Sequence, residues 1–286
     1  MTLVQQEVVP NCMAAPYTLC TMTMPCPAEV AVLLQSLLAR QQAILGPKLL
    51  GLYLRGSLAL GDFDPLTSDV DALCVTTTDL NHAELDALIQ MHLELAASPS
   101  RYANELELIY LTRAAAWRWQ PGETHPTLSR GSGELTLKVQ HQNWVLERWS
   151  VLRGGSASAL YGPPPETLIA PVSPAELRQA VAQRLQDWLV FARQPDDPNW
   201  GHRGHAAYAI ETLCRMLHTL RTGTLGSKAQ SAAWALTTFP EPWRQLVFES
   251  PAWKSDPAVD VLLNQQVQAL IIWGARQAEL GFPDLQ

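Results

Sequence analysis

The chain has 286 residues, of which 47% are hydrophobic and 16% charged, and its formal net charge is -7. This composition is typical of a globular protein with a substantial core, long enough for one large domain or two ordinary ones. The sequence contains no basic stripe, which argues against a nucleic-acid partner. The excess of acidic residues would instead attract a small cationic ligand.

The sequence carries no export or membrane signal. The first 39 residues contain no Lys or Arg, so the basic start of a signal peptide is missing, and no apolar run approaches the roughly 18 residues of a membrane span. The five cysteines form no CxxC pair. We therefore expect a cytoplasmic protein with no membrane partner. A monomer is also expected. Residues 1–27 show no regular period and are interpreted as a flexible leader.

Helices and strands are both predicted in the first half of the chain. A helical period over 28–46 stops at Gly46-Pro47, and a second helix over 81–97 begins with Asn81 as its cap. Runs rich in aliphatic residues predict strands over 49–54, 69–77, 105–111 and 133–139.

The second half is predicted to be almost entirely helical. Residues 156–174 are rich in Gly, Ser and Pro and are interpreted as a linker. Helical patterns then cover 174–194, 204–223, 227–239 and 258–280. The fold class is therefore α+β, with a mixed helix–strand domain over 28–155 and an all-helical domain over 175–286.

Two features of the first half point to phosphate chemistry. Gly56-Ser57 directly follows a predicted strand, where glycine lets a phosphate approach the backbone and a helix start offers free N–H groups. Asp69 and Asp71 are two residues apart, so on a strand they project from one face. Their oxygens are hard ligands of the kind that Mg²⁺ prefers.

A carboxylate on the next predicted strand, Glu105 or Glu107, could remove a proton from a hydroxyl group. Each feature alone has an ordinary explanation, because a Gly-Ser pair is usually a turn and an Asp-x-Asp a solvated strand end. The ordered set is more specific than its parts. It describes in-line attack of an alcohol on a nucleotide phosphate.

The stretch LYLRGSLALGDFDPLTSDVDALCV, residues 52–75, resembles the signature of polymerase-β-like nucleotidyltransferases. With AAWRWQP, ALYGPPPETLIAPVSPAEL and GSKAQSAAWAL, the chain resembles more closely the streptomycin/spectinomycin adenylyltransferases, over about residues 28–253. The resemblance implies a nucleotidyltransferase domain with a small mixed sheet, a helical bundle and an active site between them. It also implies Mg²⁺-dependent transfer of AMP from ATP to a hydroxyl of an aminoglycoside or aminocyclitol antibiotic, a small cationic acceptor.

Carried over position by position, the resemblance gives four N-terminal residues a role. Asp69 and Asp71 match the Mg²⁺ ligands of the family. Gly56 and Ser57 match the turn that holds the triphosphate.

The resemblance also assigns the base and two contacts to ATP. Glu105, twelve residues before Trp117, matches the catalytic base, with Glu107 as the alternative because it would share the strand face. Lys228 matches an ATP-contacting lysine, and Arg215 an arginine that faces the same cleft. Without the resemblance, both would be interpreted as ordinary surface charges.

Three positions depart from the family pattern. Streptomycin-modifying members carry tryptophan where this chain has Leu135 and aspartate where it has His205, so we expect spectinomycin to be favoured over streptomycin. Arg55 stands where an apolar or aromatic residue is common. Asp196-Asp197 is interpreted as a solvated turn that could attract a cation. Two alternatives stay open: the same chemistry on a metabolite or protein acceptor, and a non-catalytic nucleotide-binding protein.

Overall fold

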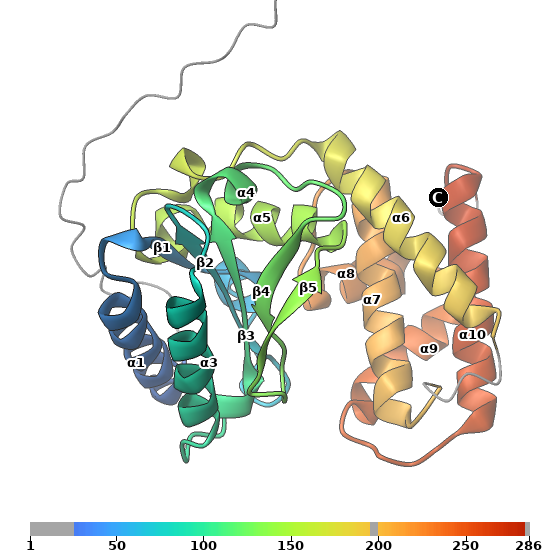
Figure 1. The fold of residues 1–286 in the computed structure, drawn as a ribbon. Helices are drawn as coiled ribbons and strands as arrows, with labels where there is room; N and C mark the ends of the chain where they lie inside the picture. Colours follow the sequence, from blue (N-terminus) through green and yellow to red (C-terminus); the bar gives the residue numbers. More distant parts are fainter. Residues whose placement is uncertain (1–25, 195–199, 284–286) are drawn as a thin grey trace, which may run out of the picture.

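The computed structural model of the protein describes residues 26–194 and 200–283. An N-terminal half built around a six-stranded sheet is followed by a C-terminal half of packed helices (Figure 1). This arrangement confirms the predicted α+β fold class. Residues 1–25 of the predicted leader lie outside the described residues, and so does the Asp196-Asp197 turn.

The sheet is mixed. Its strands are β1 (Leu49–Leu54), β2 (Val70–Thr76), β3 (Leu106–Thr112), β4 (Thr124–Leu128), β5 (Leu135–Val139) and β6 (Ala159–Tyr161). They follow the order β5-β4-β3-β2-β1-β6 across the sheet. Strands β2 and β3 run parallel, while the other neighbours pair antiparallel. The parallel pair brings the starts of β2 and β3 to the same edge, where two of the predicted acidic stretches lie.

Helices cover both faces of the sheet (Figure 1). The helices of this half are α1 (Ala28–Leu45), α2 (Gly56–Leu60), α3 (His82–Ala96), α4 (Arg113–Trp117) and α5 (Asn143–Gly154). Leu52 and Cys74 pack in a core with α1 and α3, whereas their neighbours Tyr53 and Leu73 pack in a second core with α4 and α5. Since alternate side chains of a strand point to opposite faces, burial of both faces makes these strands continuous apolar runs.

Two helix ends follow local signals in the sequence. The Asn81 side chain accepts a hydrogen bond from the backbone N–H of Glu84, and the Glu84 carboxylate accepts one from Asn81, so α3 starts with a capping box. Helix α1 ends at Gly46, whose φ of 52° is readily adopted only by glycine. Both ends agree with the sequence prediction.

The C-terminal half has its own core. Its helices are α6 (Pro174–Ala192), α7 (Arg203–Thr222), α8 (Lys228–Thr238), α9 (Trp243–Glu249) and α10 (Val261–Glu279). Leu185, Leu213, Leu217 and Ile271 are buried together at its centre. Within the described part of the chain, no helix is long and apolar enough to cross a membrane.

The segment predicted as a linker, 156–174, differs from that prediction. It contains β6, which pairs with β1 at the edge of the sheet, with Tyr161 opposite Leu52 and Ala159 opposite Tyr53. A strand of three residues is too short to produce a recognisable alternation, and the surrounding Gly and Pro residues indicate a loop. Strand β4 was missed for a similar reason, because Pro126 interrupts its five residues.

Candidate active site

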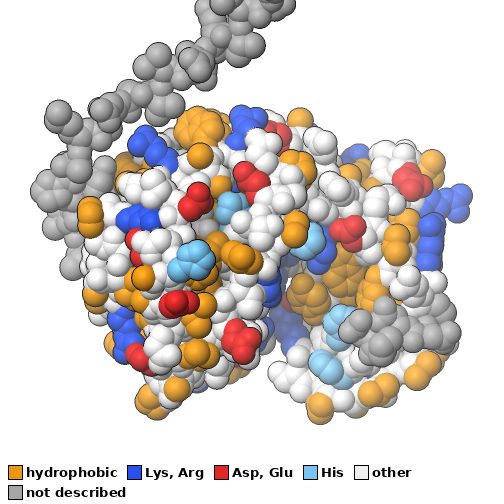
Figure 2. Space-filling model, viewed as in Figure 1, with side chains coloured by type: hydrophobic (Ala, Val, Ile, Leu, Met, Phe, Trp, Pro, Cys, Tyr) orange, Lys and Arg blue, Asp and Glu red, His pale blue; other side chains and the backbone are white. Residues whose placement is uncertain are grey.

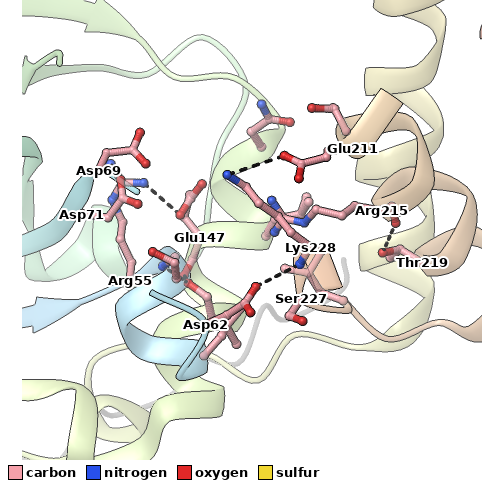
Figure 3. Close-up of a pocket in the computed structure, with 18 of the residues that line it drawn as sticks. Arg55, Asp62, Asp69, Asp71, Glu147, Glu211, Arg215, Thr219, Ser227 and Lys228 are labelled. Atoms are coloured by element: carbon pink, nitrogen blue, oxygen red, sulfur yellow. Dashed lines mark hydrogen bonds and ion pairs between the residues drawn. The ribbon is translucent and has the colours of Figure 1, made fainter. Parts of the chain in front are cut away.

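A cavity of about 260 Å³ lies between the two halves of the protein. Figure 2 shows the surface hollowed there, with basic side chains inside the hollow. The acidic residues Asp69, Asp71 and Glu147 come from the N-terminal half, and Lys228 and Arg215 face them from the helical half (Figure 3). Both halves of the chain are therefore needed to form this cavity.

Gly56 and Ser57 lie in the cavity wall, as the first two residues of α2. Gly56 has a φ of +58°, and a Cβ atom at this position would collide with Oδ2 of Asp71, so the position requires glycine. The Ser57 hydroxyl is buried and has no hydrogen-bond partner among the described residues. A buried hydroxyl that lines a cavity is available to a ligand oxygen.

Three carboxylates converge beside this turn. Asp71 and Glu107 are register partners on the parallel strands β2 and β3, and Asp69 directly precedes β2. One carboxylate oxygen from each residue lies within 4.8 Å of the other two. Carboxylates this close repel one another, and a divalent cation would relieve the repulsion, so the cluster fits Mg²⁺.

The electrostatics of Asp71 reflect this crowding. Burial raises the pKa of its carboxyl group, the positive charge of Arg55 opposes that rise, and the neighbouring carboxylates Glu147, Asp69 and Glu107 add to it. Arg55 Nη2 lies 3.1 Å from Asp71 Oδ1. A positive charge next to Asp71 is therefore part of the structure even without a metal.

Glu105 is not a member of the three-carboxylate cluster and does not line the cavity. It ends the short 3-10 turn η2 (Ala103–Glu105) before β3, and its carboxylate lies 2.5 Å from Nε of Arg130. The predicted strand started at residue 105, whereas β3 starts at Leu106, so Glu105 lies in the turn that precedes the strand. Its partner Arg130 also lies 4.0 Å from Oδ2 of Asp69. The structure instead places the alternative residue, Glu107, in the cavity wall beside Asp69 and Asp71.

The helical half contributes the predicted cations. Lys228 opens α8, and its backbone N–H donates to Asp62 Oδ2 at 3.0 Å, which joins the two halves at the cavity. Its Nζ atom lies 4.0 Å from Glu211 Oε2. Arg215, on α7, lines the same cavity, and its Nε has no hydrogen-bond partner among the described residues. Every predicted site residue except Glu105 thus lines one cavity.

Sequence reasoning missed five charged residues of this cavity: Arg55, Asp62, Glu147, Arg184 and Glu211. Arg55 was noted only as a departure before Gly-Ser, although an arginine at the end of a buried strand is itself a signal that carboxylates lie nearby. Asp62 and Glu147 gave no comparable signal, because an acidic residue in a loop or on a helix is usually solvated.

Residues 167–269 match the family model described as "Aminoglycoside adenylyltransferase, C-terminal domain". The aminoglycoside (3'') (9) adenylyltransferase of Escherichia coli is 25% identical to the chain over 230 residues, which is 78% of this chain and 84% of the relative. The spectinomycin 9-adenylyltransferase of Staphylococcus aureus is 24% identical over 206 residues, or 69% of this chain and 75% of the relative. The chain is a homologue of the aminoglycoside adenylyltransferases.

A solved structure of the spectinomycin adenyltransferase AAD(9) from Enterococcus faecialis, with ATP and spectinomycin, has a similar fold. It superimposes with a TM-score of 0.66 at 18% identity and covers 87% of this chain and 99% of that one. At this identity the match concerns the fold. Together, the comparisons confirm the family resemblance and the enzyme class that the sequence predicted.

The two positions that depart from streptomycin-modifying members of this family do not line the cavity themselves. Leu135 is buried in the core at the start of β5. His205 lies in the first turn of α7, where its ring stacks on Tyr208 with centroids 6.3 Å apart. Tyr208 lines the cavity, so His205 reaches the site through this neighbour.

Proposed function

We propose that the protein transfers AMP from ATP, with Mg²⁺, to a hydroxyl group of an aminoglycoside or aminocyclitol. The observation that carries this proposal is a single cavity in which the carboxylates at the start of β2 and β3 face Lys228 and Arg215. The helical wall belongs to the segment that matches the adenylyltransferase family model. The matched domain thus faces the carboxylates across the cavity.

Binding of the triphosphate would use both walls. Asp69 and Asp71 would hold Mg²⁺, which when bound offsets negative charge on the phosphate oxygens. The Ser57 hydroxyl is free to donate to a phosphate oxygen, and the absence of a side chain at Gly56 allows close approach. Lys228 would contact phosphate oxygens from the opposite wall, and Arg215 would do the same with its unpartnered Nε.

Glu107 is the proposed base. Its side chain is about one-third exposed, so an acceptor in the cavity can reach it. The carboxylate takes the proton of the acceptor hydroxyl, and the oxygen forms a bond to the α-phosphorus while the bond from phosphorus to pyrophosphate breaks. The proton remains on Glu107, and the electron pair of the broken bond leaves with pyrophosphate.

The proposed acceptor is cationic, with spectinomycin favoured over streptomycin. Six acidic and four basic residues of the described chain line the cavity, so its lining is acidic overall, which would attract an ammonium-bearing ligand. At position 205 an imidazole stands where streptomycin-modifying relatives have a carboxylate, which removes a charge-assisted contact.

The test is to incubate the purified protein with ATP and Mg²⁺ and with spectinomycin, streptomycin or kanamycin, and to examine the products by mass spectrometry. We expect an acceptor whose mass has increased by one adenylyl group, with release of pyrophosphate, and no product with the Asp71→Asn variant. Pyrophosphate release without modification of any of the three compounds would favour a different acceptor. ATP binding with no release would favour a non-catalytic protein.

A further inference from the structure

A buried arginine completes the carboxylate cluster from inside the protein. Arg55 is only 6% exposed and is the residue between β1 and α2. Its Nη2 lies 3.1 Å from Asp71 Oδ1 and 3.4 Å from Glu107 Oε2. Its Nη1 lies 2.9 Å from Glu147 Oε2 (Figure 3). One guanidinium group therefore contacts three carboxylates from three different elements.

The orientation of this guanidinium group is fixed by its other neighbours. The Nε–H donates to the carbonyl of Ala72 at 3.2 Å, and the Trp144 ring lies against the guanidinium, with its centroid 5.1 Å from the central carbon. The guanidinium fork is planar and permanently charged, so it can hold several carboxylates in a fixed arrangement.

The charges of the cluster are unbalanced without Arg55. The buried carboxylate of Asp71 would then lie close to Asp69, Glu107 and Glu147 without its guanidinium partner, and removing the partner of a buried charge is strongly destabilising. Glu147 is not part of the group of carboxylates that could share one divalent ion, which is Asp69, Asp71 and Glu107. Arg55 contacts Glu147 as well as Asp71 and Glu107, and so connects Glu147 to that group.

We propose that Arg55 is a built-in cation of the site: it takes the position beside Asp71 and Glu107 that a second metal ion would otherwise occupy. The carboxylates are then held in place before any metal arrives, and the cluster binds one divalent ion. Arg55 is thus a positioning residue. This inference rests on the proposed function for the role of the cluster, but its test requires neither ATP nor an acceptor.

Metal stoichiometry gives the first readout. Mn²⁺ is titrated into the full-length protein, and free ion is followed by electron paramagnetic resonance. We expect one bound Mn²⁺ per chain for the wild type and two for Arg55→Met. One bound ion in both proteins would overturn the proposal.

Thermal stability gives the second readout. In EDTA, Arg55→Met should melt about 6–15 °C below the wild type, and millimolar MgCl₂ should restore most of that loss. The matched control is Arg118→Met, which removes an exposed arginine that pairs with Glu176 at 3.3 Å. The melting temperature of this variant should respond to MgCl₂ as that of the wild type does. NaCl at equal ionic strength separates specific binding from screening. An Arg55→Met protein that melts like the wild type in EDTA, or whose loss MgCl₂ does not repair, contradicts the proposal.

If Arg55→Met does not fold under either condition, Arg55→Lys decides. Lysine keeps one charge but cannot replace the fork that contacts three carboxylates. The proposal is supported if Arg55→Lys melts below the wild type in EDTA and MgCl₂ restores the difference. It is overturned if Arg55→Lys and the wild type melt at the same temperature in EDTA. Failure of AMP transfer to every tested acceptor would count against the proposed function alone, because neither readout depends on transfer.

Discussion

Asp71 and Glu107 are direct register partners on the two parallel strands of the sheet, although they are far apart in the sequence. Parallel pairing brings equivalent ends of two strands to one edge, so both carboxylates open into the same cavity together with Asp69. In the proposed function, this arrangement lets a proton acceptor and two metal ligands act on one phosphate group.

Removing a carboxylate from the Asp69–Asp71 pair should abolish AMP transfer. Either Asp69→Asn or Asp71→Asn halves the negative charge that this pair offers to Mg²⁺, and we expect product formation to fall to the background of the assay. Asp79→Asn changes an exposed aspartate that follows β2 and should behave like the wild type. Near-native turnover in either variant of the pair would remove the basis for a metal site here.

The base is tested by two matched substitutions on either side of Leu106. Glu107→Gln should lower kcat by about 10²- to 10⁴-fold with little change in ATP affinity, because it removes only the proton acceptor. Glu105→Gln should have a much smaller effect, since that carboxylate pairs with Arg130 outside the cavity lining. Steady-state kinetics on both variants decide between them. The reverse result would restore Glu105 as the base.

ATP affinity should depend on the helical half. Lys228→Ala removes one charge-assisted phosphate contact, which should weaken binding by roughly 1.5–3 kcal/mol, or about 10- to 150-fold in Kd. Lys254→Ala is the control, because Lys254 pairs with Glu211 at 2.6 Å but does not line the cavity. Isothermal titration calorimetry measures both. Equal affinities would mean that α8 does not contact the nucleotide.

The acceptor range should be narrow. In a susceptible bacterium, expression of the protein should raise resistance to spectinomycin and give little or none to streptomycin, because His205 cannot replace a carboxylate contact to a cationic sugar. His205→Asp should then increase streptomycin resistance if the side chain acts on the cavity beside Tyr208. Equal resistance of the wild type to both antibiotics would refute this narrow range.

Stability should fall in acid through one buried histidine. Burial lowers the pKa of His92 to about 4, and its Nε2 lies 2.8 Å from the Tyr110 hydroxyl. Above pH 6.5 the ring is neutral in both states and contributes no pH dependence. Between about pH 6.5 and 4 the unfolded chain takes up a proton that the folded protein does not, which costs the folded state up to about 3 kcal/mol.

His92→Gln should therefore lose less stability than the wild type over that pH range, as measured by urea unfolding at each pH. His141→Gln, at an exposed histidine, is the control and should follow the wild type. If the His92→Gln and wild-type curves are parallel from pH 7 to 4, another group dominates acid unfolding.

Several features of the fold could be predicted because their causes are local. The capping pair Asn81 and Glu84 sets the start of α3, and Gly46 sets the end of α1, through contacts within a few residues. Apolar runs predicted β1 and β2, and hydrophobic periodicity predicted the long C-terminal helices, for the same reason. Strands β4 and β6 could not be predicted, since they are stabilised mainly by pairing with neighbouring strands rather than by their own short sequences.

The sequence by itself determined the types of group in the candidate site: a Gly-Ser turn, an Asp-x-Asp pair and a following glutamate. The two cations in the helical half were singled out only by the family resemblance. Only the tertiary structure decided which of them meet. Glu105 and Glu107 are equivalent in a sequence pattern with a period of two, and the 3-10 turn before β3 separates them. Arg55 gained its three carboxylate partners from β2, β3 and α5, which no local signal connects. Burial and ion pairing depend on elements distant in the chain, so these contacts exist only once the sheet and the helices have packed.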